Sequence, residues 1–239
     1  MILDSFMFTD PGGRDENQDY VGKRELKDAG LYLLADGLGG HRLGNLASET
    51  AITSMLSSWR EDKLWTPEYM RECISKANES VRNLQREKNC AAKSTIVALA
   101  IKGKNAIWAH CGDSRLYFIY KGKIVAVTED HSVAYRKYKA GEITREEIAW
   151  DEDQSSLLRA LGNESRWKPN ISGTEKLREG VDLLLCSDGF WEYITDQEIL
   201  DDNVETKSAV DWGEKMLKRV QSRFKPGNDN YSLITVKVK

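Results

Sequence analysis

The sequence predicts an α+β chain in which β-sheets are stacked in layers with helices on the outside. Short apolar runs typical of strands fill the middle of the chain, between residues 94 and 120, and two amphipathic helix patterns precede them. A further helix pattern stands before the last strand-like run, at residues 230–238. Helices covering the outer faces of layered sheets are one of the few stable ways to bury such elements. No linker-like stretch interrupts the chain, so we expect one domain over residues 1–239.

The elements are expected in the following order. A buried strand at Gly30–Ala35 runs into an acidic, glycine-rich turn. Apolar residues recur every four positions from Ala47 to Trp59, which predicts a helix with one buried face. A second helix should begin at Thr66-Pro67, because this pair is a helix start signal. Later elements are strands at 94–101, 106–111 and 116–120, a hairpin turn at 121–123, a polar excursion at about 128–164, a strand at 181–186, a helix at 209–224 and a strand at 230–238.

Composition excludes several classes of protein. With 35 basic and 38 acidic residues the net charge is −3, which gives no electrostatic reason to expect a nucleic-acid partner. No segment approaches the ~20 apolar residues of a membrane-spanning helix, and the first ten residues lack the basic cluster of a secretory signal. The four cysteines, Cys73, Cys90, Cys111 and Cys186, form no C-x-x-C pair, so we expect reduced thiols in a cytoplasmic protein.

Aspartates recur where apolar strands are predicted to end. The positions are Asp36, Asp113, Asp188 and Asp229, while Asp15 and Asp19 are expected in a similar polar turn near the N-terminus. Turns favour Asp and Gly, so any single case means little, but four strand ends could converge on one rim. Clustered carboxylates resist ionisation unless cations are bound, and all-oxygen ligand sets suit Mg²⁺ or Mn²⁺. Gly37 would let its backbone carbonyl approach such a metal.

Other chemistries do not fit the sequence. No cysteine is followed by the C-x₅-R pattern of cysteine-based phosphatases, and no phosphate-binding loop of the P-loop type exists. The three histidines have no metalloprotease spacing, and His110 is expected to be structural. The segment Asp151–Ser155 faintly suggests an aspartyl-phosphate nucleophile loop, but it follows no apolar strand and is interpreted as a solvated acidic loop.

The chain resembles the metal-dependent serine/threonine protein phosphatases of the protein phosphatase 2C type (PP2C, also PPM), in their compact bacterial form. The resemblance covers essentially the whole chain and is carried by seven motifs in the family's order: Arg14–Asp19, Ala35–His41, Gly112–Arg115, Thr128–Ser132, Leu158–Gly162, Leu185–Trp191 and Asp229-Asn230. It implies a central antiparallel β-sandwich flanked by helices on both sides, a four-layer αββα arrangement. It also implies a metal centre at one edge, with residues of about 128–162 forming a flap beside it.

The resemblance also implies the roles of individual residues. Asp36 would bridge two metals, Gly37 would offer its carbonyl, and Asp188 and Asp229 would complete the shell of the first metal. Asp113 and Asp188 would frame a third, weaker ion, and Asp19 would act mostly through bound water. The implied cofactors are Mn²⁺ or Mg²⁺, two per site. The implied catalytic residues are Arg14, Asp36 and Asp188, with Arg14 holding the substrate phosphate.

These roles predict hydrolysis by a metal-activated water without a covalent intermediate. Eukaryotic relatives carry a glutamate where Gln18 stands and a histidine, the proposed general acid, where Leu38 stands. The group that protonates the leaving alcohol therefore stays open. His41 is one candidate, and it could equally fix the loop after Gly40.

We therefore expect a cytoplasmic, monomeric protein phosphatase acting on phosphoserine and phosphothreonine. Its expected partner is a phosphoprotein substrate, an opposing serine/threonine kinase is a candidate partner, and neither nucleic acid nor membrane is expected. Two alternatives remain at this stage. One is a catalytically inactive PP2C-like domain that only binds or regulates a partner, and the other is a metallohydrolase acting on small phosphate esters.

Overall fold

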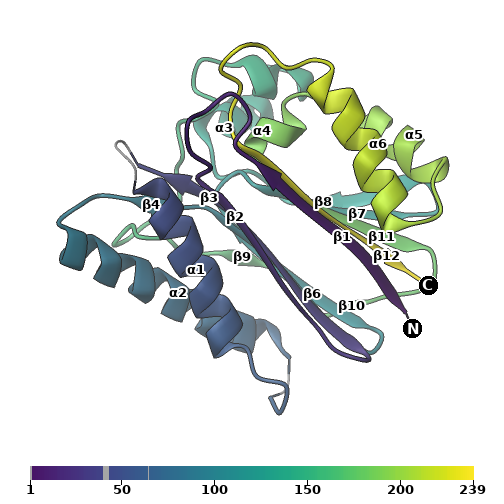
Figure 1. Ribbon diagram of the computed structural model, residues 1–239, viewed down its shortest axis with the longest axis horizontal. Helices are drawn as coiled ribbons and strands as arrows, with labels where there is room; N and C mark the ends of the chain where they lie inside the picture. The colour runs from purple at the N-terminus through teal and green to yellow at the C-terminus, as the bar shows by residue number, and fades with distance from the viewer. Residues whose placement is uncertain (1, 40–42, 64) are drawn as a thin grey trace.

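Two antiparallel sheets pack face to face in the centre of the structure. The computed structural model describes residues 2–39, 43–63 and 65–239. One sheet has the strand order β1-β12-β11-β7-β8, and the other has the order β10-β6-β5-β3-β2, with β4 pairing β3 and β9 pairing β6. Figure 1 shows α1 and α2 along one outer face and α5 and α6 on the opposite one. The predicted four-layer α+β sandwich is confirmed.

The helices and strands have the following bounds. The strands are β1 Leu3–Asp10, β2 Asp19–Glu25, β3 Ala29–Leu38, β4 Lys93–Ser94, β5 Ile96–Lys102, β6 Asn105–Cys111, β7 Arg115–Tyr120, β8 Lys123–Val127, β9 Asn170–Ile171, β10 Glu175–Lys176, β11 Val181–Cys186 and β12 Tyr231–Val238. The helices are α1 Gly44–Ser58, α2 Pro67–Lys88, α3 Val133–Ala140, α4 Asp188–Trp191, α5 Asp196–Val204 and α6 Ala209–Gln221, with a 3₁₀ turn, η1, at Glu146–Trp150.

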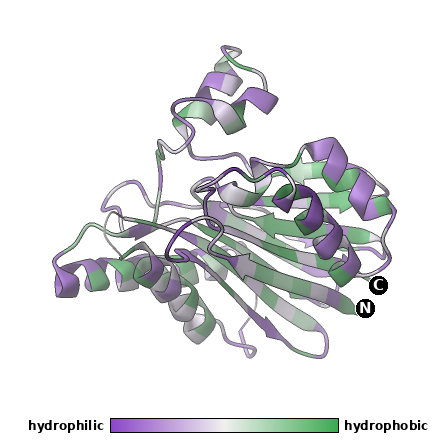
Figure 2. Cartoon of the chain, turned by 45° about the horizontal axis from the view of Figure 1, so that its top comes forward, coloured by the Kyte–Doolittle hydropathy of each residue, from purple (hydrophilic) through white to green (hydrophobic). Residues whose placement is uncertain are grey.

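Three layers of apolar side chains hold these elements together. One lies between the two sheets and includes Leu34, Leu99 and Ile234. The second joins the seven-stranded sheet to α1 and α2, and the third joins the five-stranded sheet to α5 and α6. Figure 2 shows green along much of the central strands and purple alternating with green along the helices, as expected for helices with one buried face.

Local signals in the sequence explain several boundaries. The Thr66 side chain accepts a hydrogen bond from the Tyr69 backbone N–H at 3.2 Å, and Pro67 opens α2, as predicted. The predicted hairpin turn joins β7 to β8, and both Lys121 and Gly122 have positive φ angles, at 52° and 67°. Such angles match the twist of the flanking strands.

The N-terminal strands are the main difference from the expectation. The predicted elements begin at Gly30, but the structure has two earlier strands: β1 pairs with β12, and β2 pairs with β3. Both are edge strands, so neither carries the continuous apolar run of a central strand. Helix α5 also lies outside the predicted elements, and α6 ends at Gln221 rather than at residue 224.

The excursion after β8 is built from short helices, as predicted. It contains α3 and η1, and its two ends meet where the Leu158 N–H donates to the carbonyl of His131 at 2.7 Å. The acidic loop is tied by Lys137, whose Nζ lies 2.9 Å from Asp151 and 2.8 Å from Asp153. No helix among the described residues has the length and apolar character needed to cross a membrane.

Candidate metal centre

Three aspartates meet at one end of the sandwich. Asp36 lies near the end of β3, Asp113 lies between β6 and β7, and Asp188 opens α4 directly after β11. One carboxylate oxygen of each lies within 4.8 Å of the others. The prediction that strand ends converge on one rim is therefore confirmed for these three residues.

Hydrogen bonds to Thr95 fix the backbone at Asp36, and close packing against Asn230 fixes the backbone after Asp188. The Asp36 N–H donates to the hydroxyl of Thr95 at 2.9 Å, and the Thr95 N–H donates to the Asp36 carbonyl at 2.8 Å. After Asp188, a Cβ added at Gly189 would lie 2.1 Å from the carbonyl oxygen of Asn230. Only glycine therefore allows the start of α4 to pack this closely against the start of β12.

Asp113 lies in a connection between the two sheets. The sequence predicts that Asp113 stands at the tip of a strand pair, and this is wrong, because β6 and β7 belong to different sheets. The indole N–H of Trp191 donates to the Asp113 carbonyl at 3.0 Å. The side chain is 3% exposed, and its Oδ1 atom has no hydrogen-bond partner within the described ranges.

The raised pKa values of these carboxyl groups show that their ionised forms are unfavourable when no cation is bound. Burial, with the charge of Asp188 second, raises the pKa of Asp36 and that of Asp113 well above the ordinary value. Burial, followed by the charge of Asp229, raises the pKa of Asp188 to about 6. A bound divalent cation would reverse this, because it favours the ionised form of every carboxylate around it. The donor set, made of oxygen atoms, fits Mg²⁺ or Mn²⁺.

Asp19 is a buried neighbour of this cluster. The sequence places it in a polar turn, but it is the first residue of β2 and is 5% exposed. Its Oδ2 atom accepts hydrogen bonds from the hydroxyls of Ser187 and Ser232, both at 2.7 Å. Its Oδ1 atom is buried without a partner among residues 2–39, 43–63 and 65–239. Burial raises its pKa to about 7.

A cavity of about 460 Å³ opens beside the aspartates. Arg14, Asp36, Gly37, Asp188 and Asp229 all line it. Arg14 lies 3.1 Å from Asp229, and both side chains are about half exposed, at 54% and 49%. Asp229 therefore reaches the cavity without belonging to the group of three carboxylates.

Gly37 must be a glycine in this fold. A Cβ added there would lie 2.0 Å from the carbonyl oxygen of Gly44 and 2.8 Å from that of Gln18. The Gly37 N–H also donates to the Gln18 carbonyl at 2.9 Å. Gly40 and His41 lie outside the described residues, so the structure does not test the His41 alternatives.

Asn230 is a residue that sequence reasoning did not assign to the site. Its amide nitrogen donates to the carbonyls of Pro11 and Glu16 at 2.8 and 2.9 Å, and its oxygen accepts from the Gln18 N–H at 2.8 Å. These bonds hold the loop that carries Arg14 against β12. The Asp-Asn pair at 229–230 was the available signal, but only the aspartate was interpreted as functional.

Glu192 is a second residue that was missed. It lies one helical turn after Asp188, and burial, followed by the charges of Asp188, Asp113 and Asp229, raises its pKa to about 9. The excursion after β8 also touches the site, since the Gln154 amide lies 3.4 Å from the Asp188 carboxylate. His110 is buried, and its Nε2 lies 2.7 Å from the Glu129 carbonyl, as a structural histidine would.

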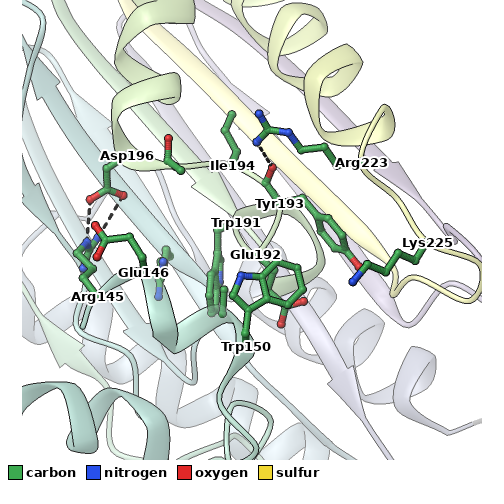
Figure 3. Close-up of a pocket in the computed structure, with 13 residues that line it drawn as sticks. Arg145, Glu146, Trp150, Trp191, Glu192, Tyr193, Ile194, Asp196, Arg223 and Lys225 are labelled. Carbon is green, nitrogen blue, oxygen red and sulfur yellow. Dashed lines mark hydrogen bonds and ion pairs between the residues drawn. The ribbon is translucent and has the colours of Figure 1, made fainter. Parts of the chain in front are cut away.

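A neighbouring hollow of about 420 Å³ is lined by Arg145 and Trp150 of the excursion and by Trp191, Asp196 and Lys225 (Figure 3). Across it, Arg145 lies 2.8 Å from Asp196 at the start of α5. Lys225 lies 5.3 Å from the centre of the Trp150 ring. Glu192 lines this hollow as well, so the hollow adjoins the acidic site.

Comparison with known proteins decides the family. The sequence profile of the family described as Protein phosphatase 2C matches residues 14–229. The chain belongs to the protein phosphatase 2C family. Within it, the chain is 36% identical over 203 residues to protein phosphatase PhpP of Streptococcus pneumoniae, covering 82% of each protein.

Solved phosphatase 2C structures share this fold. A serine/threonine phosphatase of S. agalactiae superposes with a TM-score of 0.87 over 100% of both chains, at 30% identity. The catalytic domain of the serine/threonine protein phosphatase PstP, solved in complex with two manganese ions, has a TM-score of 0.84 over 98% of this chain and 97% of that one. At 24% identity, the likeness to PstP concerns the fold.

Proposed function

We propose that this chain is a metal-dependent protein phosphatase that hydrolyses phosphoserine and phosphothreonine. The observation that carries the proposal is the meeting of the Asp36, Asp113 and Asp188 carboxylates beside a cavity that Asp36, Asp188 and Arg14 line. Membership of the phosphatase 2C family supports the reaction, and its relatives named protein phosphatase support a protein substrate.

Four aspartates and one backbone carbonyl would hold the divalent cations. Asp36 would contact two cations, Gly37 would offer its carbonyl, and Asp188 and Asp229 would complete one shell. Asp113 would share a third, weaker cation with Asp188. When bound, Mn²⁺ or Mg²⁺ would lower the pKa of a water so that it can attack phosphorus as hydroxide near neutral pH. The cation would also place positive charge next to the phosphate oxygens.

Arg14 would bind the substrate phosphate. Its guanidinium is half exposed at the mouth of the cavity, and its planar fork can hold two phosphate oxygens at once. The pair with Asp229 keeps the guanidinium directed toward the aspartates before substrate arrives. A negatively charged phosphate would then share Arg14 with Asp229, and this would offset charge on the oxygens as the bond to the leaving group breaks.

The buried cysteine and histidine side chains are poorly placed to attack the phosphate, which favours attack by water. Burial raises the pKa of the Cys111 thiol to about 12, and it raises that of Cys186 further. Burial lowers the pKa of His131 to about 3, so this ring stays neutral. None of these groups lines the cavity, and a covalent phosphoenzyme is therefore not part of the proposal.

Asp19 would act on the site through water. Its unpartnered Oδ1 atom belongs to a carboxyl that two serine hydroxyls already orient. We further propose that the chain is a single monomeric domain, that residues of about 128–162 act as a flap, and that a serine/threonine kinase opposes it in the cytoplasm.

The test is hydrolysis of a phosphothreonine peptide and of p-nitrophenyl phosphate after treatment with EDTA and after return of Mn²⁺. Activity on both substrates that vanishes with chelator and returns with metal is expected. Full activity in metal-free protein would contradict the proposal. Activity on the aryl phosphate alone would favour a small-ester hydrolase, and no activity with metal bound would favour an inactive binding domain.

A further inference from the structure

The turn that carries Asp113 is bonded to His131 through both backbone polar groups of Gly112. The His131 N–H donates to the Gly112 carbonyl at 2.9 Å, and the Gly112 N–H donates to the His131 Nδ1 atom at 3.1 Å. Gly112 has a φ of 115°, and an added Cβ would lie 2.6 Å from Thr95. The backbone before Asp113 is thus held in a conformation that few residues can adopt.

The His131 ring is itself firmly placed. It is 7% exposed and stacks on the His110 ring, with centroids 4.6 Å apart and planes 10° apart. Because Nδ1 accepts the Gly112 N–H, the proton of the neutral ring lies on Nε2. That side faces Asn170, whose Oδ1 atom also accepts a hydrogen bond from Arg159 at 3.0 Å. Arg159 Nη1 also lies 3.4 Å from Nε2, but in this tautomer it cannot donate to the protonated nitrogen.

The Asp113 carboxylate depends on these backbone contacts. Its Oδ1 atom is buried and has no hydrogen-bond partner among the residues the structure describes. Its main chain is held by the hydrogen bond from the Trp191 indole to its carbonyl and by the flanking bonds at Gly112. A carboxylate without side-chain partners takes its position from its backbone, so a shift of the turn would move it directly.

We propose that His131 is a positioning residue: through Nδ1 it holds the Gly112 peptide, and thereby sets where the Asp113 carboxylate meets a divalent cation. This rests on the proposed function, in which Asp113 and Asp188 share the weaker cation. His131 also stands at the root of the flap, because its carbonyl accepts the Leu158 N–H at 2.7 Å. The flap and the Asp113 turn are therefore bonded to the same residue.

Two substitutions separate the hydrogen bond from the packing. In His131→Asn, the side-chain oxygen can occupy the place of Nδ1 and accept the Gly112 N–H. In His131→Gln, the amide lies one bond farther out, near the place of Nε2, so that acceptor is lost. Both variants lose the stacking on His110 equally, and any difference between them reports the hydrogen bond.

Three measurements are made on each variant and on Asp113→Ala. They are the number and affinity of bound Mn²⁺ ions by equilibrium dialysis with electron paramagnetic resonance, kcat and KM on p-nitrophenyl phosphate, and Tm in EDTA. Removing a group that orients a metal ligand typically costs about 10–100-fold in affinity. We expect His131→Gln to weaken the weaker Mn²⁺ site by about that factor, with lower kcat, little change in KM and unchanged tight sites. His131→Asn should retain most of the wild-type behaviour.

The outcomes distinguish this inference from the assignment of Asp113. Equal behaviour of the two His131 variants, whether both normal or both impaired, overturns the role of the hydrogen bond. If Asp113→Ala keeps the weaker Mn²⁺ site, the assignment of Asp113 fails and the inference fails with it. If His131→Gln does not fold, His131→Asn decides alone, because it keeps the acceptor for the Gly112 N–H. A folded His131→Asn variant that loses the weaker Mn²⁺ site also overturns the inference.

Discussion

Replacing Asp19 by asparagine should stabilise the metal-free protein at pH 8. Asp19 is 5% exposed, and burial raises its pKa from 3.8 to about 7. The hydrogen bonds from Ser232 and Ser187 oppose this rise, and the negative charges of Asp188 and Asp229 add to it. The folded state therefore keeps a proton that the unfolded state releases. The stability of the metal-free chain falls as pH rises from about 4 to about 7.

The size of the effect follows from this difference in pKa. The rise from 3.8 to about 7 corresponds to about 4 kcal/mol of destabilisation once the pH is above 7. The asparagine oxygen can still accept from Ser187 and Ser232, but its amide nitrogen takes the place of the unpartnered Oδ1 atom. An unsatisfied amide costs about 1–3 kcal/mol, so we expect a net gain of about 1–3 kcal/mol. For a chain of this size the gain corresponds to a rise in Tm of about 2–12 °C.

The assay is thermal unfolding in EDTA at pH 4 and pH 8. The gain of Asp19→Asn should appear at pH 8 and disappear at pH 4, which is close to the unfolded-state pKa of 3.8, because little of the wild-type penalty remains there. Asp4→Asn is the matched control. Burial raises the pKa of Asp4, but the hydrogen bonds from Lys239 and from the Ala209 N–H outweigh burial, so the pKa is lowered overall. This variant should therefore lose stability at pH 8. A lower Tm for Asp19→Asn than for wild type at pH 8 would refute the reasoning.

Three further predictions concern neighbouring residues. Arg14→Ala should raise KM for a phosphopeptide several-fold while Mn²⁺ binding stays intact, and a loss of bound metal would show that Arg14 is misplaced. Arg115→Ala should cost about 3–5 kcal/mol in urea unfolding, because it leaves the buried Asp130 carboxylate, 2.6 Å away, without its partner; a loss under 1 kcal/mol would contradict this. Gly189→Ala should cost about 1–3 kcal/mol through the clash with the Asn230 carbonyl, whereas Gly173→Ala, with nothing within 4 Å, should be neutral, and equal Tm values would count against the close approach.

Much of the fold could be predicted because its central strands are strongly apolar. The runs at 96–102 and 181–186 are buried along most of their length, and the motifs at their ends could be placed from the sequence. The edge strands β1 and β2 could not, because each is covered on fewer sides and mixes polar with apolar residues. Asp19 was consequently placed in a turn, although it is a buried strand residue.

The candidate site was predictable where its residues lie at or beside the ends of apolar strands. Asp36, Asp113 and Asp188 follow apolar strands, so local sequence marks them. Asn230 acts through hydrogen bonds to residues more than 200 positions away in the chain, and no local pattern reveals such bonds. The connection of Asp113 between the two sheets is likewise a property of topology, since a hairpin and a sheet-to-sheet crossing can have the same short turn.

The measurement that tests the central claim most directly is the number of Mn²⁺ ions bound to wild type and to Asp36→Asn, with kcat determined on the same samples. If Asp36 contacts two cations at the meeting point of the three carboxylates, the variant should lose tightly bound Mn²⁺ together with phosphatase turnover. Wild-type Mn²⁺ binding and near-normal kcat in Asp36→Asn would contradict the account.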